Sequence, residues 1–156
     1  MRLHEAVQTL SRHLYLRAGR TQTIAGRLQD AGVISKTEGS RRYPEEISLD
    51  DTVALFIASI TETSLGGSAA TTMTFAALTD PAGTPFVRAV ADLLFLEDLP
   101  AGDIAIHLTP PAATVAIDGE LVVFGANEPA PGAVSARFIG ATTISALRAE
   151  LNKKEN

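Results

Sequence analysis

Residues 20–44, RTQTIAGRLQDAGVISKTEGSRRYP, predict a short amphipathic helix that ends at a glycine. Thr21 is a suitable N-cap, because a threonine hydroxyl can accept a hydrogen bond from a free backbone N–H of the first turn. The helix is expected over residues 22–31, where one side carries the apolar residues Ile24, Leu28 and Ala31. Gly32 stands at the expected C-terminus, where the left-handed backbone conformation favours glycine.

A basic β-hairpin is expected directly after this helix. Val33 and Ile34 begin an extended segment, residues 38–39 (Glu-Gly) form a turn, and residues 40–43 return. Pro44 ends the return strand, because proline lacks the N–H that a β-ladder requires. The stretch therefore predicts a helix and a hairpin joined by almost no linker.

Positive charge is concentrated in this first part of a chain that is acidic overall. The 156 residues carry a formal net charge of −5, yet residues 1–44 hold eight Lys or Arg against three acids. Residues 45–156 hold five Lys or Arg against fifteen acids, so the two parts carry +5 and −10. This asymmetry favours contact between the N-terminal part and a polyanion.

The helix pattern TIAGRLQDAGVI, followed at once by a basic hairpin, resembles the recognition helix and wing of a winged helix-turn-helix DNA-binding domain. The resemblance covers residues 1–44. It implies that the apolar side of the helix packs on other helices and that the polar side enters the major groove of duplex DNA. Groove contacts are implied for Gln22, Thr23, Gly26 and Arg27, since Gln and Arg can pair with adenine and guanine edges. Phosphate contacts are implied for Arg20, Lys36, Arg41 and Arg42.

The chain departs from the family pattern in one respect. A winged domain has two helices before its recognition helix, whereas residues 1–19 accommodate one, expected over residues 2–16 and ended by Ala18-Gly19. A helix expected over residues 49–61, or a second subunit, is a candidate for the missing element. A basic stretch of this kind is also compatible with an ordinary solvated surface, or with RNA or another polyanion as the partner.

The remaining chain, residues 46–156, predicts an acidic α+β oligomerisation region, separate from a winged-helix-like DNA-binding module over residues 1–45. Its first helix follows Ser48, a suitable N-cap, and is apolar on almost every side, which indicates burial all round by its own chain or by another copy. The small residues of segment 63–83 are compatible with a helix over residues 69–78 or with a loop. Thr84-Pro85 predicts a helix with proline at its first position, running to about residue 96.

After this helix the apolar period changes to two, which is typical of strands. Strands are expected over residues 104–108, 114–117, 120–124 and 134–139, and Asp118-Gly119 is a strong hairpin signal because both turn positions need positive φ. Thr142 or Thr143 is expected to cap a last helix. The predicted fold is therefore a helix-turn-helix with a basic wing, then helices and a small antiparallel sheet with a terminal helix.

Several classes of function lack their sequence signatures. The chain has no Cys, which excludes disulfides, thiolate catalysis and zinc fingers, and it has no phosphate-binding glycine motif or nucleophile elbow. His4 and His13 are too far apart on one helix to form a metal pair, and His107 alternates with apolar residues of a strand. We therefore expect no enzyme activity, no metal and no cofactor. The N-terminus is amphipathic and no apolar stretch reaches membrane-spanning length, so we expect a cytoplasmic protein.

The sequence as a whole predicts an oligomeric protein that binds double-stranded DNA, with transcriptional regulation as the leading function. Small terminase subunits of tailed phages are similar in layout and size, so a DNA-packaging recognition subunit is an alternative. A structural or adaptor protein without DNA contact, such as a virion component, is an alternative of another class. A regulator with a ligand pocket within residues 84–140 is a further one.

Overall fold

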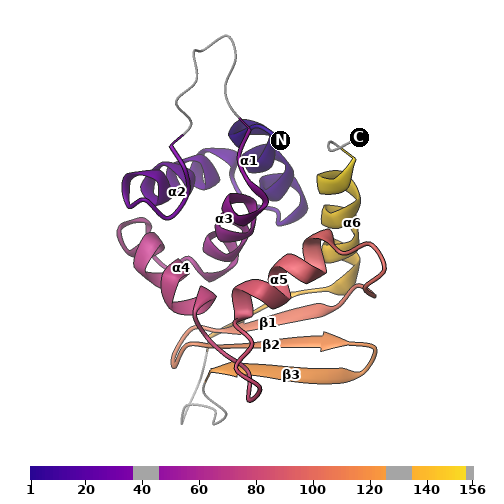
Figure 1. Cartoon of the computed structure of the whole chain (residues 1–156). Helices are drawn as coiled ribbons and strands as arrows, with labels where there is room; N and C mark the ends of the chain where they lie inside the picture. Colours follow the sequence, from indigo (N-terminus) through magenta and orange to yellow (C-terminus); the bar gives the residue numbers. More distant parts are fainter. Residues whose placement is uncertain (37–45, 126–134, 154–156) are drawn as a thin grey trace.

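A computed structural model of the chain describes residues 1–36, 46–125 and 135–153. Over these residues the fold is mixed α and β, with helices gathered on one side of a four-stranded antiparallel sheet (Figure 1). The helices are α1 Leu3–His13, α2 Ala18–Asp30, α3 Leu49–Thr61, α4 Ser68–Ala76, α5 Phe86–Phe95 and α6 Ala141–Asn152, with a 3₁₀ turn, η1, at Leu65–Gly67. The strands are β1 Asp103–His107, β2 Ala112–Ile117, β3 Glu120–Gly125 and β4 Ala136–Ile139. None of the helices in the described residues is long and apolar enough to cross a membrane.

The sheet has the strand order β3-β2-β1-β4, and each pair is antiparallel. Alternation along the strands places one set of side chains in the core, and these are Ile104, Ile106, Ala113, Val115, Phe124 and Ile139. The opposite set, on the face away from the helices, includes a cross-strand row made of Phe138, Ala105, Thr114 and Val123. Phe138 is 71% exposed and Leu121 on β3 is 67% exposed, so this second face presents apolar side chains to solvent.

The hairpin between β2 and β3 forms as the sequence predicts. Asp118 and Gly119 have φ angles of 50° and 81°, which are the positive values that a two-residue turn with the correct twist requires. The predicted strands after residue 102 are all present, with ends that differ by one or two residues; residue 134 lies outside the described residues.

Helix α3 lies at the centre of the helical layer. The side chains from Val53 to Thr61 are buried with the exception of Ala54, which is half-buried, so the prediction of a helix buried all round is confirmed. Its neighbours are α1, α2, α4 and α5 of the same chain. Its start is fixed by Ser48, whose hydroxyl accepts a hydrogen bond from the Asp51 N–H at 3.0 Å.

One contiguous cluster of buried apolar side chains connects the N-terminal helices with the rest of the chain. It includes Leu10 of α1, Leu28 of α2, Phe56 of α3, Leu94 of α5 and Leu147 of α6. The expected division into residues 1–45 and 46–156 therefore does not coincide with a break in the core.

The boundary between the first two helices differs from the prediction. Helix α1 ends at His13, the chain turns through Tyr15 with a φ of 54°, and α2 begins at Ala18. Thr21 is therefore a buried residue inside α2 and not its N-cap. Its hydroxyl accepts a hydrogen bond from the Ser11 hydroxyl at 2.9 Å, a contact across the two helices that local sequence does not reveal.

Three further features refine the predictions. The helix alternative for segment 63–83 is confirmed, since η1 and α4 lie there. Pro85 is the N-cap of α5 and not its first helical residue, so the helix begins one residue later than predicted. Gly140, and neither Thr142 nor Thr143, precedes α6, and the first N–H of that helix, at Ala141, donates to the Asp103 carboxylate at 2.7 Å. A carboxylate from β1 thus satisfies a helix terminus that we expected a local hydroxyl to satisfy.

Candidate nucleic-acid interface

Helix α2 separates its apolar and polar side chains into two faces. Thr21, Ile24, Ala25 and Leu28 are buried and face the core, as expected from their spacing. Gln22, Thr23 and Arg27 are exposed on the opposite side of the helix. The buried face fixes the orientation of the helix, so the exposed face is held in a defined direction by the packing of α2 on α1 and α3.

The residues expected to contact bases are brought together on this exposed face. No hydrogen bond or ion pair to the Gln22 or Arg27 side chain is formed within the described part of the chain. The Thr23 hydroxyl donates to the Gly19 carbonyl at 2.9 Å and still has an oxygen that can accept. A Cβ added at Gly19 or at Gly26 would meet nothing within 4 Å, so there is open space beside the helix backbone at these two positions.

The Gly32 stop forms as predicted, but no strand follows within residues 33–36. Gly32 has a φ of 70°, and the N–H groups of Gly32 and Val33 bond to the Gln29 and Leu28 carbonyls at 3.1 and 2.9 Å. Ile34 is buried, and Lys36 is exposed. The rest of the expected wing, with Arg41 and Arg42, lies outside the described residues.

Arg20 is placed differently from the other candidate residues. Its guanidinium forms a two-point ion pair with the Glu62 carboxylate, with Nε–Oε2 and Nη2–Oε1 distances of 3.1 and 2.7 Å. The Arg20 side chain is 49% exposed, whereas the Glu62 side chain is 7% exposed. Arg20 thus neutralises a buried carboxylate and is only partly available to a phosphate. The sequence gives no sign of this pair, since 42 residues separate its members.

The helix expected over residues 49–61 forms as α3. It contacts both α1 and α2, so three helices pack together in the N-terminal part of the fold. However, α3 follows α2 in the chain, whereas a winged helix-turn-helix domain has both supporting helices before the recognition helix.

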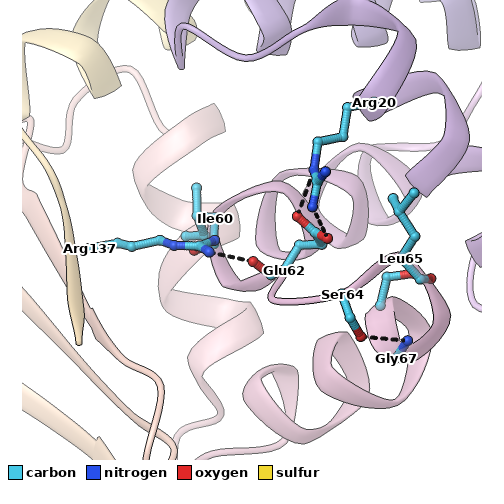
Figure 2. Close-up of polar contacts among 8 residues, drawn as sticks. Arg20, Ile60, Glu62, Ser64, Leu65, Gly67 and Arg137 are labelled. Carbon is cyan, nitrogen blue, oxygen red and sulfur yellow. Dashed lines mark hydrogen bonds and ion pairs between the residues drawn. The ribbon is translucent and has the colours of Figure 1, made fainter. Parts of the chain in front are cut away.

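A polar cluster at the C-terminal end of α3 was not predicted from the sequence. The Arg137 guanidinium, from β4, donates to the Ile60 carbonyl at 3.0 Å and to the Glu62 carbonyl, while Arg20 binds the Glu62 side chain (Figure 2). Helix α3 has no basic residue in its own last turn, so Arg137 supplies the cation that complements the negative end of its dipole. Beside this cluster lies a cavity of about 500 Å³.

The cavity is open to solvent and is bordered by elements that are distant in sequence. Its lining comes from the α1–α2 turn and α2, from the end of α3, and from β4. Most of its lining residues lie outside residues 84–140, so it does not match the ligand pocket that we considered from the sequence. Its apolar wall consists of Leu14, Leu16, Ile24, Ile60, Phe138 and Ile139, and its polar wall includes Arg20, Glu62 and Arg137.

No set of three or more potential metal-ligating His, Asp or Glu side chains is found among the described residues. The clearest electrostatic perturbation is at Glu150 on α6, far from the α2 surface in sequence. Burial would raise the pKa of Glu150, but hydrogen bonds with His13 and Thr9 and the charge of Arg12 together hold it below its ordinary value. These contacts fix α6 on α1 and suggest a structural role.

The chain matches no protein-family model, and no curated protein and no solved structure is significantly similar to it.

Proposed function

We propose that the chain binds duplex DNA through α2, in the manner of a winged helix-turn-helix protein, and acts as a transcriptional regulator. The observation that carries the proposal is the exposed row of Gln22, Thr23 and Arg27 on a helix whose other face is anchored in the core. An α-helix fits the major groove, where Gln and Arg side chains distinguish adenine and guanine. The missing side chains at Gly19 and Gly26 leave room for a close approach to base edges.

Phosphate contacts would come from basic residues around α2. Arg17 at its N-terminus and Lys36 after its C-terminus are both exposed, and Arg41 and Arg42 belong to the segment that joins α2 to α3. Each neutralised phosphate adds to affinity and to its dependence on salt. Because Glu62 balances the charge of Arg20, we assign Arg20 a smaller part in phosphate binding than the sequence suggests.

Self-association is part of the proposal, because two recognition helices on one assembly would engage two half-sites. Phe138 and Leu121, exposed on the outer face of the sheet at its two edge strands, support it, since apolar side chains on an open face can mark protein contacts. The same face supports an assembly role in DNA packaging or in a structural complex. Sedimentation equilibrium distinguishes a regulator from a packaging subunit, because a dimer favours a regulator and a ring of many copies favours a packaging subunit.

The test of DNA binding is fluorescence anisotropy of the full chain with a mixed-sequence duplex at several salt concentrations, followed by Arg27→Ala at a selected site. We expect the logarithm of the binding constant to fall linearly with the logarithm of salt. Arg27→Ala should cost about 1–3 kcal/mol at the selected site and relax the preference at one base pair.

Arg88→Ala is the matched control, because Arg88 is an exposed arginine on α5 that is paired with Asp92 and lies away from α2. This variant should bind DNA as the wild type does. Absence of binding at low salt, or equal losses in the Arg27 and Arg88 variants, would contradict the assignment of α2 and favour the structural or adaptor alternative.

A further inference from the structure

The cavity between the α1–α2 turn, α3 and β4 has the composition of a ligand site. Its volume of about 500 Å³ lies within the usual range for small-molecule pockets, roughly 300–1,000 Å³. Half of its lining residues are aliphatic or aromatic, and the charged groups Arg20, Glu62 and Arg137 lie together at one part of it. An apolar chamber with a few converging polar groups is the arrangement that binds amphipathic small molecules.

The three charged groups leave one donor edge without a partner. Arg137 is directed at the terminal carbonyls of α3, and the Glu62 carboxylate occupies the Nε and Nη2 groups of Arg20 (Figure 2). A guanidinium has five N–H donors, so the Nη1 amino group and the second Nη2 hydrogen of Arg20 remain. No described residue accepts a hydrogen bond from that Nη1 group.

The charge of the cluster indicates the sign of a ligand. Two arginines and one glutamate give a formal charge of +1 beside an apolar wall. A carboxylate matches the planar, two-donor edge of a guanidinium in geometry as well as in charge. An ammonium group would meet the two arginines and has no comparable acceptor edge, because Glu62 already accepts from Arg20 with both oxygens.

We propose that this cavity binds a small monocarboxylate with an apolar body, whose carboxylate takes the open edge of Arg20 and whose apolar part lies against Leu16, Ile24 and Ile60. The proposal does not depend on DNA binding. It adds a ligand to a protein whose proposed function needs none, and it places that ligand on the helix that carries Gln22 and Arg27.

The test is a titration of the isotopically labelled full chain with sodium hexanoate, followed by amide chemical shifts. Hexanamide is the matched neutral probe. We expect saturable shifts at Leu16, Thr21 and Phe138, and about ten-fold weaker binding of hexanamide, because the charged hydrogen bond is replaced by neutral ones. Equal binding of the two probes, shifts confined to other parts of the chain, or no saturable shift would overturn the proposal.

Two substitutions in the same ion pair separate ligand binding from damage to the fold. Arg20→Gln removes the open edge and leaves the Glu62 charge, so the preference for hexanoate over hexanamide should vanish. Glu62→Gln removes the opposing charge, so that preference should rise above the wild-type ratio. Each substitution breaks the ion pair and affects the fold in a similar way. If the preference for hexanoate over hexanamide changes in the same direction in both variants, the assignment is contradicted.

The apolar wall is tested at a half-buried residue outside the core cluster, which limits damage to the core. Leu16 lies in the α1–α2 turn, and Leu16→Ala should weaken both probes by at least about three-fold through lost apolar contact. Leu121→Ala is the control, since Leu121 is exposed on the outer face of the sheet and does not line the cavity. Equal effects of the two substitutions would overturn the proposal.

Discussion

Glu150 is the residue with the most partners on a single side chain in the described structure. Its Oε1 accepts from the Thr9 hydroxyl at 2.8 Å and from Arg12 Nη2 at 2.5 Å, and its Oε2 lies 2.8 Å from His13 Nε2. The three partners belong to α1, whereas Glu150 belongs to α6, so one carboxylate connects the two ends of the chain. The carboxylate is three-quarters buried, so solvent screens these contacts only in part.

Replacing this carboxylate should reduce stability in a pH-dependent manner. The pKa of Glu150 is lowered in the folded state, so its contribution is present above the unfolded-state pKa and is lost as pH falls through the folded one. Glu150→Gln should therefore lower the free energy of unfolding by about 1 kcal/mol at neutral pH, and the difference should shrink as pH falls below the ordinary carboxyl value of 4.5. Urea unfolding of both proteins across pH measures this. A difference that is constant with pH would mean that the charge of Glu150 does not stabilise the fold.

At the scale of single elements, two glycines should respond in opposite directions to the same substitution. Gly119 has a φ of 81° in the β2–β3 turn, where an alanine Cβ is strained, so Gly119→Ala should cost about 1–2 kcal/mol. Gly26 lies inside α2 with open space around an added Cβ, so Gly26→Ala should stabilise by up to about 1 kcal/mol. Thermal unfolding of the two variants checks the pair, and a loss of stability at Gly26 would indicate that α2 is not a regular helix there.

Elements with a strong local signal were predictable from the sequence, and those that depend on distant contacts were not. The Asp118-Gly119 hairpin, the Gly32 stop and the burial of α3, which is apolar on almost every side, follow from local chemistry, and each is confirmed. The predicted start of α2 was wrong. We expected the Thr21 hydroxyl to cap its own helix, but it accepts a hydrogen bond from Ser11 of α1. The start of α6 was wrong because the Asp103 carboxylate, from β1, binds its first N–H.

The same limit applies to the candidate site. The exposed positions of Gln22, Thr23 and Arg27 follow from helical periodicity, because a buried face fixes the opposite one. The pairing of Arg20 with Glu62, and the cavity beside it, require α2, α3 and β4 to meet, and no local pattern encodes that meeting. The burial of Glu62, just after an apolar helix, is likewise visible only in the structure, where Arg20 pairs with this acid.

At the scale of the whole molecule, the core connects the basic N-terminal part to the acidic remainder. Leu10 and Leu28 belong to the same apolar cluster as the sheet residues Ile104 and Val115, with α3 between them. Polar contacts strengthen the connection, since Arg137 of β4 binds the end of α3 and Glu150 of α6 binds α1. The change of net charge near residue 45 is therefore no evidence that the two parts of the chain unfold separately.

We accordingly expect the described parts of the chain to unfold as one unit. Native-state hydrogen exchange should give the same highest free energy of opening, within about 1 kcal/mol, for core amides of α2, α3 and β2, such as Leu28, Ile57 and Val115. The conservative variant Ile24→Val, in the buried face of α2, should lower all three values together by about 0.5–1.5 kcal/mol. If only Leu28 responds while Val115 keeps its protection, the N-terminal helices open independently, and a module boundary near residue 45 would hold despite the shared core.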